Sequence, residues 1–434
     1  MAFRLCFVVW QALLANCHDK LKEKVHRISM HGRRHKHERI TRINSKVGRD
    51  INRSIILNTV RRRQPISRAA ISEVTLLNKS TVSDIVASLL EEDLLVESPD
   101  VGGRIGRTPV NLSVKQGKNL VGAISFDAPR TRIAIVDIDG TIRARDEILT
   151  SAVAPEILVP QCVARMNTLR QTLGPHRFHG IGASVAGIVD SAQSRVIYAA
   201  NLGWNNVDLG TLLRKGMPEI DLVYVENDAK ASALAELLLG KHDVVNPNLI
   251  FVLFGVGIGA GIAVHGRILA GSTHAAGEVG HMIVVDGGEP CTCGNAGCWE
   301  LYASERAPVR WFAEAKNMQT SAQSALSLSD VFSSARAGDK DALNVLHLWA
   351  QHVGVGIGDM IRILDPEMVV VGGSITQVWD LVGDDINNAA HGKGTFAHQR
   401  SIAVVPTSLM DNPALLGAAA LSIRRIFTDY SISL

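Results

Sequence analysis

The sequence predicts an α/β protein, and both its composition and its residue pattern point to this class. Hydrophobic residues make up 46% of the 434 residues, whereas aromatic residues make up only 5%. This balance, with 38 glycines available for tight turns, suits a globular α/β chain and excludes a disordered one. After Val114 the chain runs through repeated strand, turn and helix patterns. Its length is sufficient for two or three domains with a sizeable core.

Residues 1–48 are predicted to form an N-terminal extension. Residues 1–15 are mostly apolar, but Gln11 interrupts them and no small-x-small cleavage pattern precedes Cys17. We therefore expect no signal peptide, and no later run is long and apolar enough to span a membrane. Whether the native chain starts at Met1 or at Met30 stays open.

Positive charge is concentrated near the start of the chain. Between His31 and Arg68 there are twelve Lys and Arg residues against Glu38 and Asp50, a net charge of +10. Since the whole chain carries +3, the remainder sums to 3 − 10 = −7. A basic block on a mildly acidic body indicates a polyanion-binding end joined to a separate domain.

Residues 49–115 are predicted to form a winged helix-turn-helix domain that binds double-stranded DNA. One helix begins near Ile51, and a second, from Ser67 to Val74, starts at a capping serine. After a short turn, Asn78 is a natural N-cap for the helix that would read the DNA. Small polar side chains on its first turn and a half would reach base edges and phosphates. These candidate DNA contacts are Lys79, Ser80, Thr81 and Ser83.

A wing is predicted after these helices. Residues 94–97 and 102–112 read as two strands joined by a glycine- and arginine-rich tip, where Arg104 and Arg107 could enter a minor groove or contact phosphates. The alternative is a small helical bundle with a solvated basic face. Since such a module reads few base pairs, DNA binding implies a homodimer or homotetramer on paired half-sites.

The body contains several strand-like runs that end in polar or glycine-rich turns. The run 222–226 hands over to a helix at Asn227 and Asp228, which places both side chains at a strand's carboxyl end, where open α/β sheets bind ligands. The plainer alternative for Asp228 is a helix cap. The other predicted strands are 120–126, 131–138, 181–190, 249–254 and 368–371.

Three thiols and one imidazole suggest a closed, structural zinc site, because four protein ligands fill a tetrahedral shell. The set is His281, Cys291, Cys293 and Cys298. The alternative is three ordinary cysteines near a histidine. Metal binding would bring Glu278 and Glu300 toward one pocket, where carboxylates suit the hydroxyls of a sugar. The remaining cysteines, Cys6, Cys17 and Cys162, indicate no disulfide framework, so we expect a reducing cytoplasm.

The order of these motifs resembles the ROK family of sugar kinases and sugar-responsive repressors. The similarity covers residues 51–434, and its most specific parts are Gly-Glu-Val-Gly-His at 277–281 and Cys-Thr-Cys-Gly-Asn-Ala-Gly-Cys-Trp-Glu at 291–300. It implies an actin-like (ribonuclease H-like) two-lobed sugar-kinase fold over residues 118–434, with the zinc loop at 281–298. It also implies that Asn227, Asp228, Glu278, His281 and Glu300 bind the sugar. Asp228 matches the catalytic base of the family's kinases.

Two phosphate-binding loops decide between a kinase and a regulator. Where the family's kinases have Asp-x-Gly-Gly-Thr, this chain reads Asp127-Ala128-Pro129-Arg130-Thr131, so both glycines are lost and Pro129 offers no N–H to an anion. In the second loop Val256 replaces a threonine. Phosphoryl transfer depends on such positioning, so we expect efficient ATP chemistry to be lost.

The sequence therefore predicts a cytoplasmic transcriptional regulator, a repressor, with a sugar or sugar phosphate as its effector. An active ATP-dependent sugar kinase with an added DNA-binding head stays open as the alternative, as does a repressor controlled by a protein partner. The identity of the sugar, the operator sequence, the sign of regulation and the choice between dimer and tetramer are not readable from the residues.

Overall fold

The computed structural model describes residues 45–99, 110–150, 153–220, 222–242, 248–319, 326–392, 402–409 and 412–427. Most of the predicted N-terminal extension, including Met30, and the wing tip with Arg104 and Arg107 lie outside these residues. The chain divides into two compact units, Met1–Arg49 and Asp50–Leu434. No helix among the described residues is long and apolar enough to cross a membrane.

The first described part of the chain, residues 45–99 and 110–115, which we call the head, contains three helices and a small antiparallel sheet of order β1-β3-β2. Ser67 caps α3 as predicted, because its Oγ accepts a hydrogen bond from the Ala70 N–H at 3.3 Å. Asn78 occupies the cap position of α4, but its side chain forms no capping hydrogen bond. The elements are α2 (Ser45–Arg63), β1 (Ile66–Ser67), α3 (Arg68–Thr75), α4 (Lys79–Glu91), β2 (Leu95–Pro99) and β3 (Val110–Val114).

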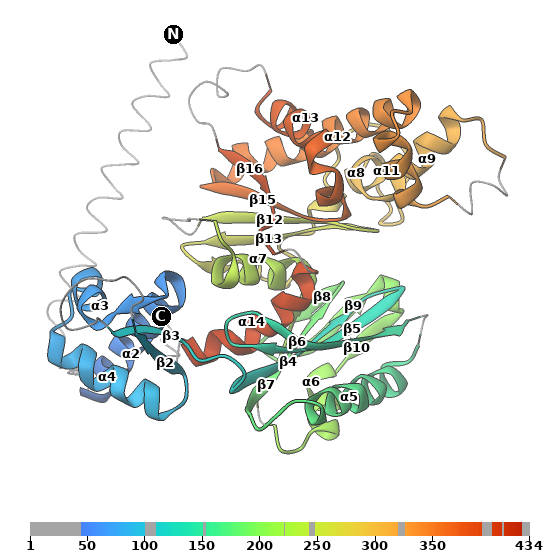
Figure 1. Cartoon of the computed structure of the whole chain (residues 1–434). Coiled ribbons are helices and arrows are strands. Elements are labelled where there is room, and N and C mark those ends of the chain that lie inside the picture. The colour runs from blue at the N-terminus through green and yellow to red at the C-terminus, as the bar shows by residue number, and fades with distance from the viewer. Residues whose placement is uncertain are drawn as a thin grey trace, which may run out of the picture. The chain divides into compact units, whose positions relative to one another are not determined.

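The first lobe is built on a five-stranded sheet of order β11-β7-β4-β5-β6, in which β11, β7 and β4 are parallel. Helices α5 (Pro155–Gln171) and α6 (Leu209–Gly216) cover one face, and α14 (Pro413–Phe427) covers the other (Figure 1). Its strands are β4 (Asn119–Phe126), β5 (Arg130–Asp137), β6 (Ile142–Leu149), β7 (Arg177–Val185) and β11 (Val223–Asn227). A smaller sheet adds β8 (Ile188–Asp190), β9 (Arg195–Ala199) and β10 (Trp204–Val207), with the short helix η1 (Ala200–Leu202).

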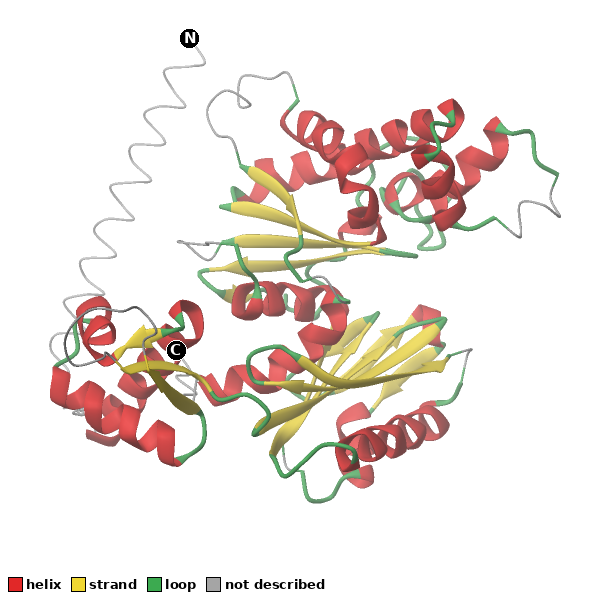
Figure 2. Ribbon diagram, in the orientation of Figure 1, coloured by secondary structure: helices red, strands yellow, loops and turns green. Residues whose placement is uncertain are grey.

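The second lobe repeats this layered design around a sheet of order β14-β13-β12-β15-β16 (Figure 2). Its strands are β12 (Leu249–Phe254), β13 (Ile258–Val264), β14 (Arg267–Ile268), β15 (Met368–Gly373) and β16 (Ala403–Pro406). Its helices are α7 (Asp228–Leu239), η2 (Val279–His281), α8 (Glu300–Ala303), α9 (Arg306–Ala315), α11 (Leu328–Arg336), α12 (Lys340–Leu364), η3 (Ser374–Val378) and α13 (Trp379–His391). The predicted α/β class with two lobes is confirmed.

Helices α7 and α14 pack closely against each other between the two sheets. Glycines permit this approach, because a Cβ added at Gly417 of α14 would lie 2.4 Å from the backbone carbon of Ala231 in α7. A Cβ at Gly182 of β7 would similarly lie 1.7 Å from the Ala418 carbonyl oxygen. Small side chains therefore let the two helices and the first sheet meet at backbone distance.

The head shares its hydrophobic core with the first lobe. Ile56, Leu57 and Val60 of α2 belong to the same buried cluster as Ile423 and Phe427 of α14. Direct contacts reinforce this core. The Phe427 carbonyl oxygen accepts hydrogen bonds from Ser54 Oγ at 2.7 Å and from Asn58 Nδ2 at 3.1 Å. At a second point Asn119 Nδ2, at the start of β4, donates to the Asp93 carbonyl oxygen at 2.7 Å.

Candidate functional site

The centre of the candidate site is the junction of β11 and α7. Asn227 ends the strand and is held by three hydrogen bonds. Its Oδ1 accepts from the Lys230 N–H at 3.0 Å, while its Nδ2 donates to the Gly187 carbonyl oxygen at 3.0 Å and to Asp228 Oδ1 at 2.9 Å. Because β11, β7 and β4 are parallel, their carboxyl ends meet at this edge. Asn227, rather than Asp228, is thus the residue that caps the helix.

Asp228 lies among other carboxylates. Its Oδ1 also accepts from the Ala229 N–H at 2.9 Å, and burial, followed by the charge of Asp127, raises its pKa to about 7. Glu278 contributes to this rise, and burial raises the pKa of both Asp127 and Glu278 above their ordinary values. A carboxylate offers about four acceptor sites, which is more than the donors to Asp228 Oδ1 fill, and burial keeps water from the rest. A ligand that presents several hydroxyl groups would supply donors to these sites.

Glu278, His281 and Glu300 come together beside the glycine-rich hairpin that connects β12 and β13. Glu300 Oε2 accepts a hydrogen bond from the Ile258 N–H at 3.1 Å. A Cβ added at Gly257 would lie 2.8 Å from this oxygen, so the hairpin needs glycine for the carboxylate to reach its backbone. Glu278 in turn interacts electrostatically with His281 and Glu300.

The His/Cys set also comes together. The four candidate ligand atoms of His281, Cys291, Cys293 and Cys298 lie within 4.8 Å of one another, so the group could hold a metal ion. Cys291 Sγ is 3.7 Å from His281 Nδ1, and Cys293 Sγ is 3.6 Å from Cys298 Sγ. Such spacings match the edges of a tetrahedron around an ion that binds sulfur at about 2.3 Å and nitrogen at about 2.0 Å. Since Nδ1 faces the thiols, Nε2 remains for another partner.

Trp299 fixes this loop to the second lobe between the metal group and Glu300. Its indole is fully buried, donates from Nε1 to the His352 carbonyl oxygen at 2.7 Å and stands edge-on to Phe254 with ring centroids 5.6 Å apart. A Cβ added at Gly356 of α12 would lie 2.2 Å from the indole, so this glycine forms a socket for the ring. Cys298 and Glu300 are therefore positioned by the same anchored residue.

In the head, the start of α4 is open to solvent. Lys79, Ser80 and Ser83 are exposed and Thr81 is half-buried, above an apolar side of α4 that packs into the core. Leu76, in the turn before α4, has a φ of 58° and is 89% exposed. At the other end of α4 the two terminal nitrogens of Arg53, Nη1 and Nη2, donate to the Glu92 carboxylate at 2.6 and 2.7 Å. The exposed first turn is thus carried on a firmly packed helix.

Comparisons with known proteins fit this geometry. The model of the ROK family matches residues 121–425. The chain belongs to the ROK family. It is 29% identical over 380 residues to the xylose repressor of Bacillus subtilis, an alignment that covers 86% of this chain and 95% of that protein.

Two solved structures define the similarity of this ROK chain further. A ROK family transcriptional regulator, a homologue of the E. coli MLC protein, is 25% identical with a TM-score of 0.72, over 88% of this chain and 97% of the other. A ROK family glucokinase from Streptomyces griseus, in complex with glucose and AMPPNP, is 27% identical with a TM-score of 0.60, over 70% of this chain and 98% of the other. The actin-like fold predicted from the family resemblance is thereby confirmed.

The first phosphate loop of this ROK chain turns its polar groups inward. Asp127 Oδ1 accepts from the neighbouring Ala128 N–H at 2.8 Å, and the buried Thr131 hydroxyl accepts from Thr150 Oγ1 at 2.7 Å. Arg130, which could in principle have contacted a phosphate, forms an ion pair with Glu147 of β6. The surviving members of the kinase pattern are therefore occupied by neighbours within the protein.

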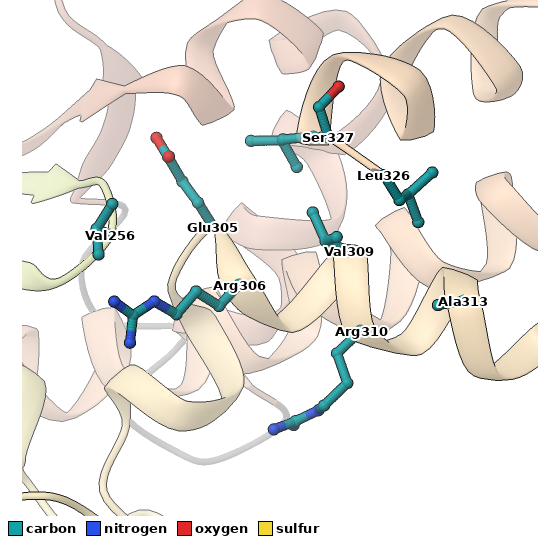
Figure 3. A pocket seen from close by; sticks show the side chains of 9 residues that line it. Val256, Glu305, Arg306, Val309, Arg310, Ala313, Leu326 and Ser327 are labelled. Carbon is teal, nitrogen blue, oxygen red and sulfur yellow. The ribbon is translucent and has the colours of Figure 1, made fainter. Parts of the chain in front are cut away.

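A cavity of about 360 Å³ adjoins the second loop. Figure 3 shows Glu305 and Arg306 on the side of this cavity toward Val256, with Val309 and Leu326 on its far side. The Glu305 N–H donates to the Gly255 carbonyl oxygen at 3.0 Å, which holds Glu305 against the hairpin. Its carboxylate adds to the rise in the pKa of Asp127, of which burial is the main cause. The carboxylate of Glu305 disfavours an anion at its end of the cavity, whereas Arg306, which also lines the cavity, has the opposite effect.

Several residues of the site escape prediction from sequence. Glu226 precedes Asn227, and its carboxylate accepts from Ser191 Oγ at 2.6 Å. Lys230, two residues after Asp228, is almost completely buried, and His274 lies 3.7 Å from Asp190. The only signal in the sequence for Glu226 and Lys230 is that a charged residue stands on each side of Asn227 and Asp228. It does not predict their partners, because Ser191 and the carbonyl groups that contact Lys230 come from distant segments.

Proposed function

We propose that this chain is a transcriptional repressor in which a sugar-binding body controls a winged helix-turn-helix head. The observation that carries this proposal is the extent of the similarity. The alignments with repressors extend over 86–88% of the chain and so include the head, whereas the glucokinase structure covers 70%. Head and body also share one core. As a DNA regulator the protein would act in the cytoplasm.

The effector is proposed to be a sugar or sugar phosphate bound by Asn227, Asp228, Glu278, His281 and Glu300. Four of these side chains can accept hydrogen bonds from ligand hydroxyls, and the free Nε2 of His281 can pair with a further hydroxyl. A ligand that lacks one hydroxyl would leave a buried polar group unpaired, which is the physical basis for discrimination between sugars. Xylose is the first sugar to test, since several relatives are named xylose repressors.

Zinc is the metal proposed for the His/Cys group, because three thiolates and one imidazole match its preferred ligands. Four protein ligands leave no open coordination position, so zinc would stabilise the loop and take no part in chemistry. The ion would fix His281 through Nδ1 and so orient Nε2 toward the sugar.

The response is proposed to travel through α7 and α14. Helix α7 begins at Asp228, α14 packs along it, and the last residue of α14, Phe427, accepts the hydrogen bonds from Ser54 and Asn58 of the head. A sugar that prefers one arrangement of α7 would therefore bias the head. Full switching requires the sugar to bind one state more tightly by about 5 kcal/mol, and partial switching requires less. Paired half-sites would be read by a homodimer or homotetramer.

The head is proposed to place α4 in the major groove, with Lys79, Ser80, Thr81 and Ser83 facing the DNA. Arg104 and Arg107 of the predicted wing complete this set, although they lie outside the described residues. We expect Lys79→Ala to weaken operator binding about 5- to 20-fold and to lower the slope of log K against log salt by about 1 per head. Fluorescence anisotropy at several salt concentrations measures both values.

Lys340→Ala is the matched control for that prediction, because Lys340 is an equally exposed lysine at the start of α12 in the second lobe. It should leave DNA affinity unchanged. Equal losses of DNA affinity in the two variants would show that only overall charge matters. Unchanged DNA affinity in Lys79→Ala would mean that Lys79 at the start of α4 does not contact the DNA.

An ATP-dependent sugar kinase remains the second candidate, and one observation favours it. A pKa of about 7 for Asp228 suits a general base at neutral pH. The inward-turned Thr131 and the carboxylate of Glu305 beside Val256 argue against productive phosphate binding. We therefore expect Asp228 to act as a hydrogen-bond acceptor for the sugar.

One experiment separates these functions. The full chain is mixed with DNA from upstream of its own coding sequence and with a panel of sugars and sugar phosphates, while ATP consumption is followed in the same tubes. We expect one sugar to release the DNA with no ATP consumed. Sugar-dependent ATP consumption would establish the kinase instead, and DNA release by no member of the panel would argue against a sugar effector.

A further inference from the structure

Lys230 is an unusual residue for the interior of a protein. It lies on the first turn of α7, two residues after Asp228, and is 2% exposed. A buried ammonium group is strongly unfavourable unless partners replace its water. Here Nζ donates to the His274 carbonyl oxygen at 2.7 Å and to the Ala270 carbonyl oxygen at 3.3 Å. The ammonium group of Lys230 therefore forms hydrogen bonds with two backbone carbonyls of one segment.

That segment, residues 270–277, which we call the strap, leads directly into Glu278. Its last residue is fixed to the second lobe, because the Ala260 N–H donates to the Gly277 carbonyl oxygen at 2.8 Å. Gly277 has a φ of 97°, and a Cβ there would lie 1.9 Å from the Ala260 carbonyl oxygen. Within the strap, His274 reaches toward the first lobe, where its Nε2 is 3.7 Å from Asp190 Oδ2. Lys230 holds the first half of the strap, at the carbonyl groups of Ala270 and His274.

The charges around Lys230 explain why a lysine can occupy this position. Glu226 and Glu278 both stabilise its ammonium group, and they oppose the burial that lowers its pKa. The Glu226 carboxylate is itself held by Ser191 Oγ and by the Asn227 N–H at 2.7 Å. Lys230 thus lies between two acidic groups, Glu226 near the end of β11 and Glu278 directly after the strap.

We propose that Lys230 is a positioning residue for the sugar site, which ties the strap to α7 and thereby sets Glu278 opposite Asn227 and Asp228. This inference rests on the proposed sugar-binding function. We assign Lys230 a positioning role and not a sugar contact, because it is 2% exposed and two of its three N–H donors are directed at backbone carbonyls of the strap. Instead it joins the two halves of the binding set, because the junction of β11 and α7 supplies Asn227 and Asp228 while the strap leads into Glu278. A displacement of about 1 Å between such halves can cost about 100-fold in a binding or catalytic site.

The test compares Lys230→Met and Lys230→Arg with the wild-type full chain. Methionine keeps the unbranched apolar stem of lysine, ends one atom short of Nζ and donates no hydrogen bond, whereas arginine keeps donors for both carbonyls. We expect Lys230→Met to weaken D-xylose binding, measured by calorimetry, about 10- to 100-fold, and Lys230→Arg to restore most of the affinity. DNA affinity without sugar should stay within about twofold of wild type for both variants, since the head lies elsewhere.

Hydrogen exchange supplies a reading that does not depend on the sugar. In Lys230→Met the amides of the strap should exchange at least about tenfold faster, while those in the interior of α7 keep their wild-type rates. Ser232→Ala is the control, because Ser232 is buried in the same helix and its hydroxyl donates to the Asp228 carbonyl oxygen of that helix. It should leave the strap unchanged.

The outcomes separate the positioning role from the function on which it depends. A wild-type chain that binds no sugar of the panel would refute the proposed function and, with it, the role of Lys230 there. If the wild-type chain binds sugar and Lys230→Met binds it equally tightly, the positioning role alone is overturned. Unchanged hydrogen exchange in the strap of Lys230→Met would have the same meaning. Faster exchange throughout α7 would show that Lys230 supports the helix generally, which also contradicts the proposal.

Discussion

Asp228→Asn should abolish the sugar response and at the same time make the protein more stable. Asparagine keeps the Oδ1 that accepts from the Ala229 N–H and from Asn227 Nδ2, so the start of α7 should not change. What disappears is a carboxylate acceptor for a sugar hydroxyl. Hydrogen bonds between charged and neutral groups contribute about 1.5–3 kcal/mol, so sugar affinity should fall about 10- to 100-fold or more.

The gain in stability results from the raised pKa of Asp228. A carboxyl group whose pKa rises from 3.8 unfolded to about 7 folded costs nothing below pH 3.8, where it is protonated in both states. The cost grows between these two values and is complete above pH 7, where it approaches an upper limit of about 4 kcal/mol. Thermal unfolding of Asp228→Asn and wild type should therefore differ little at pH 4 and most at pH 8.

Asp359→Asn is the control, because it makes the same chemical change at an exposed position of α12, where Asp359 pairs with Arg362. This variant should still release DNA when sugar is added, and its thermal unfolding should depend on pH as that of the wild type does. Retention of the sugar response in Asp228→Asn would exclude Asp228 as a sugar contact. A stability difference that did not grow with pH would mean that its carboxylate is well solvated.

Loss of the metal is expected to have the second large effect. Cys293→Ser removes one ligand from the exposed edge of the His/Cys group. We expect the purified variant to lack the zinc ion proposed for this group and to bind sugar at least about tenfold more weakly, because the loop that ends in Glu300 loses its proposed cross-link. DNA binding without sugar should persist. Metal analysis, sugar titration and a DNA shift assay on the same preparation measure the three properties.

Cys162→Ala serves as the matched cysteine control. Cys162 is buried in α5 of the first lobe, where burial raises its pKa to about 12, so it is neither a metal ligand nor a reactive thiol. This variant should retain zinc and sugar binding. Simultaneous loss of DNA binding and sugar binding in Cys293→Ser would show that the metal supports the whole fold. Full sugar affinity in a zinc-free variant would instead separate Glu300 from the metal loop.

The sequence predicted local structure well where one segment contains its own signal. The apolar runs 120–126 and 249–254 predicted buried strands, and both are central strands of their sheets. Ser67 was recognised as a cap because its partner is three residues away. The His/Cys group was also accessible, since its members lie within eighteen residues and share one chemistry.

Prediction failed where a residue's partner is remote. Thr131 matched a phosphate-binding pattern, but Thr150, the residue after β6, donates a hydrogen bond to its hydroxyl. Lys230 was not singled out from the sequence, because its acceptors come from the strap, forty residues later. Asn78 had the right position for a cap, but its side chain forms no such bond. Short-range pattern identifies the type of element, whereas tertiary contacts decide what each polar group does.

The contact between Phe427 and the head also bears on how the protein is made. The hydrogen bonds that Ser54 and Asn58 donate end on the backbone carbonyl of Phe427, the last residue of the final described helix. A ribosome releases the head's helices first and α14 last, so a chain interrupted before residue 427 carries the helices of the head without this support. Incomplete translation products would thus lack the hydrogen bonds that complete molecules form between α14 and their own helix α2.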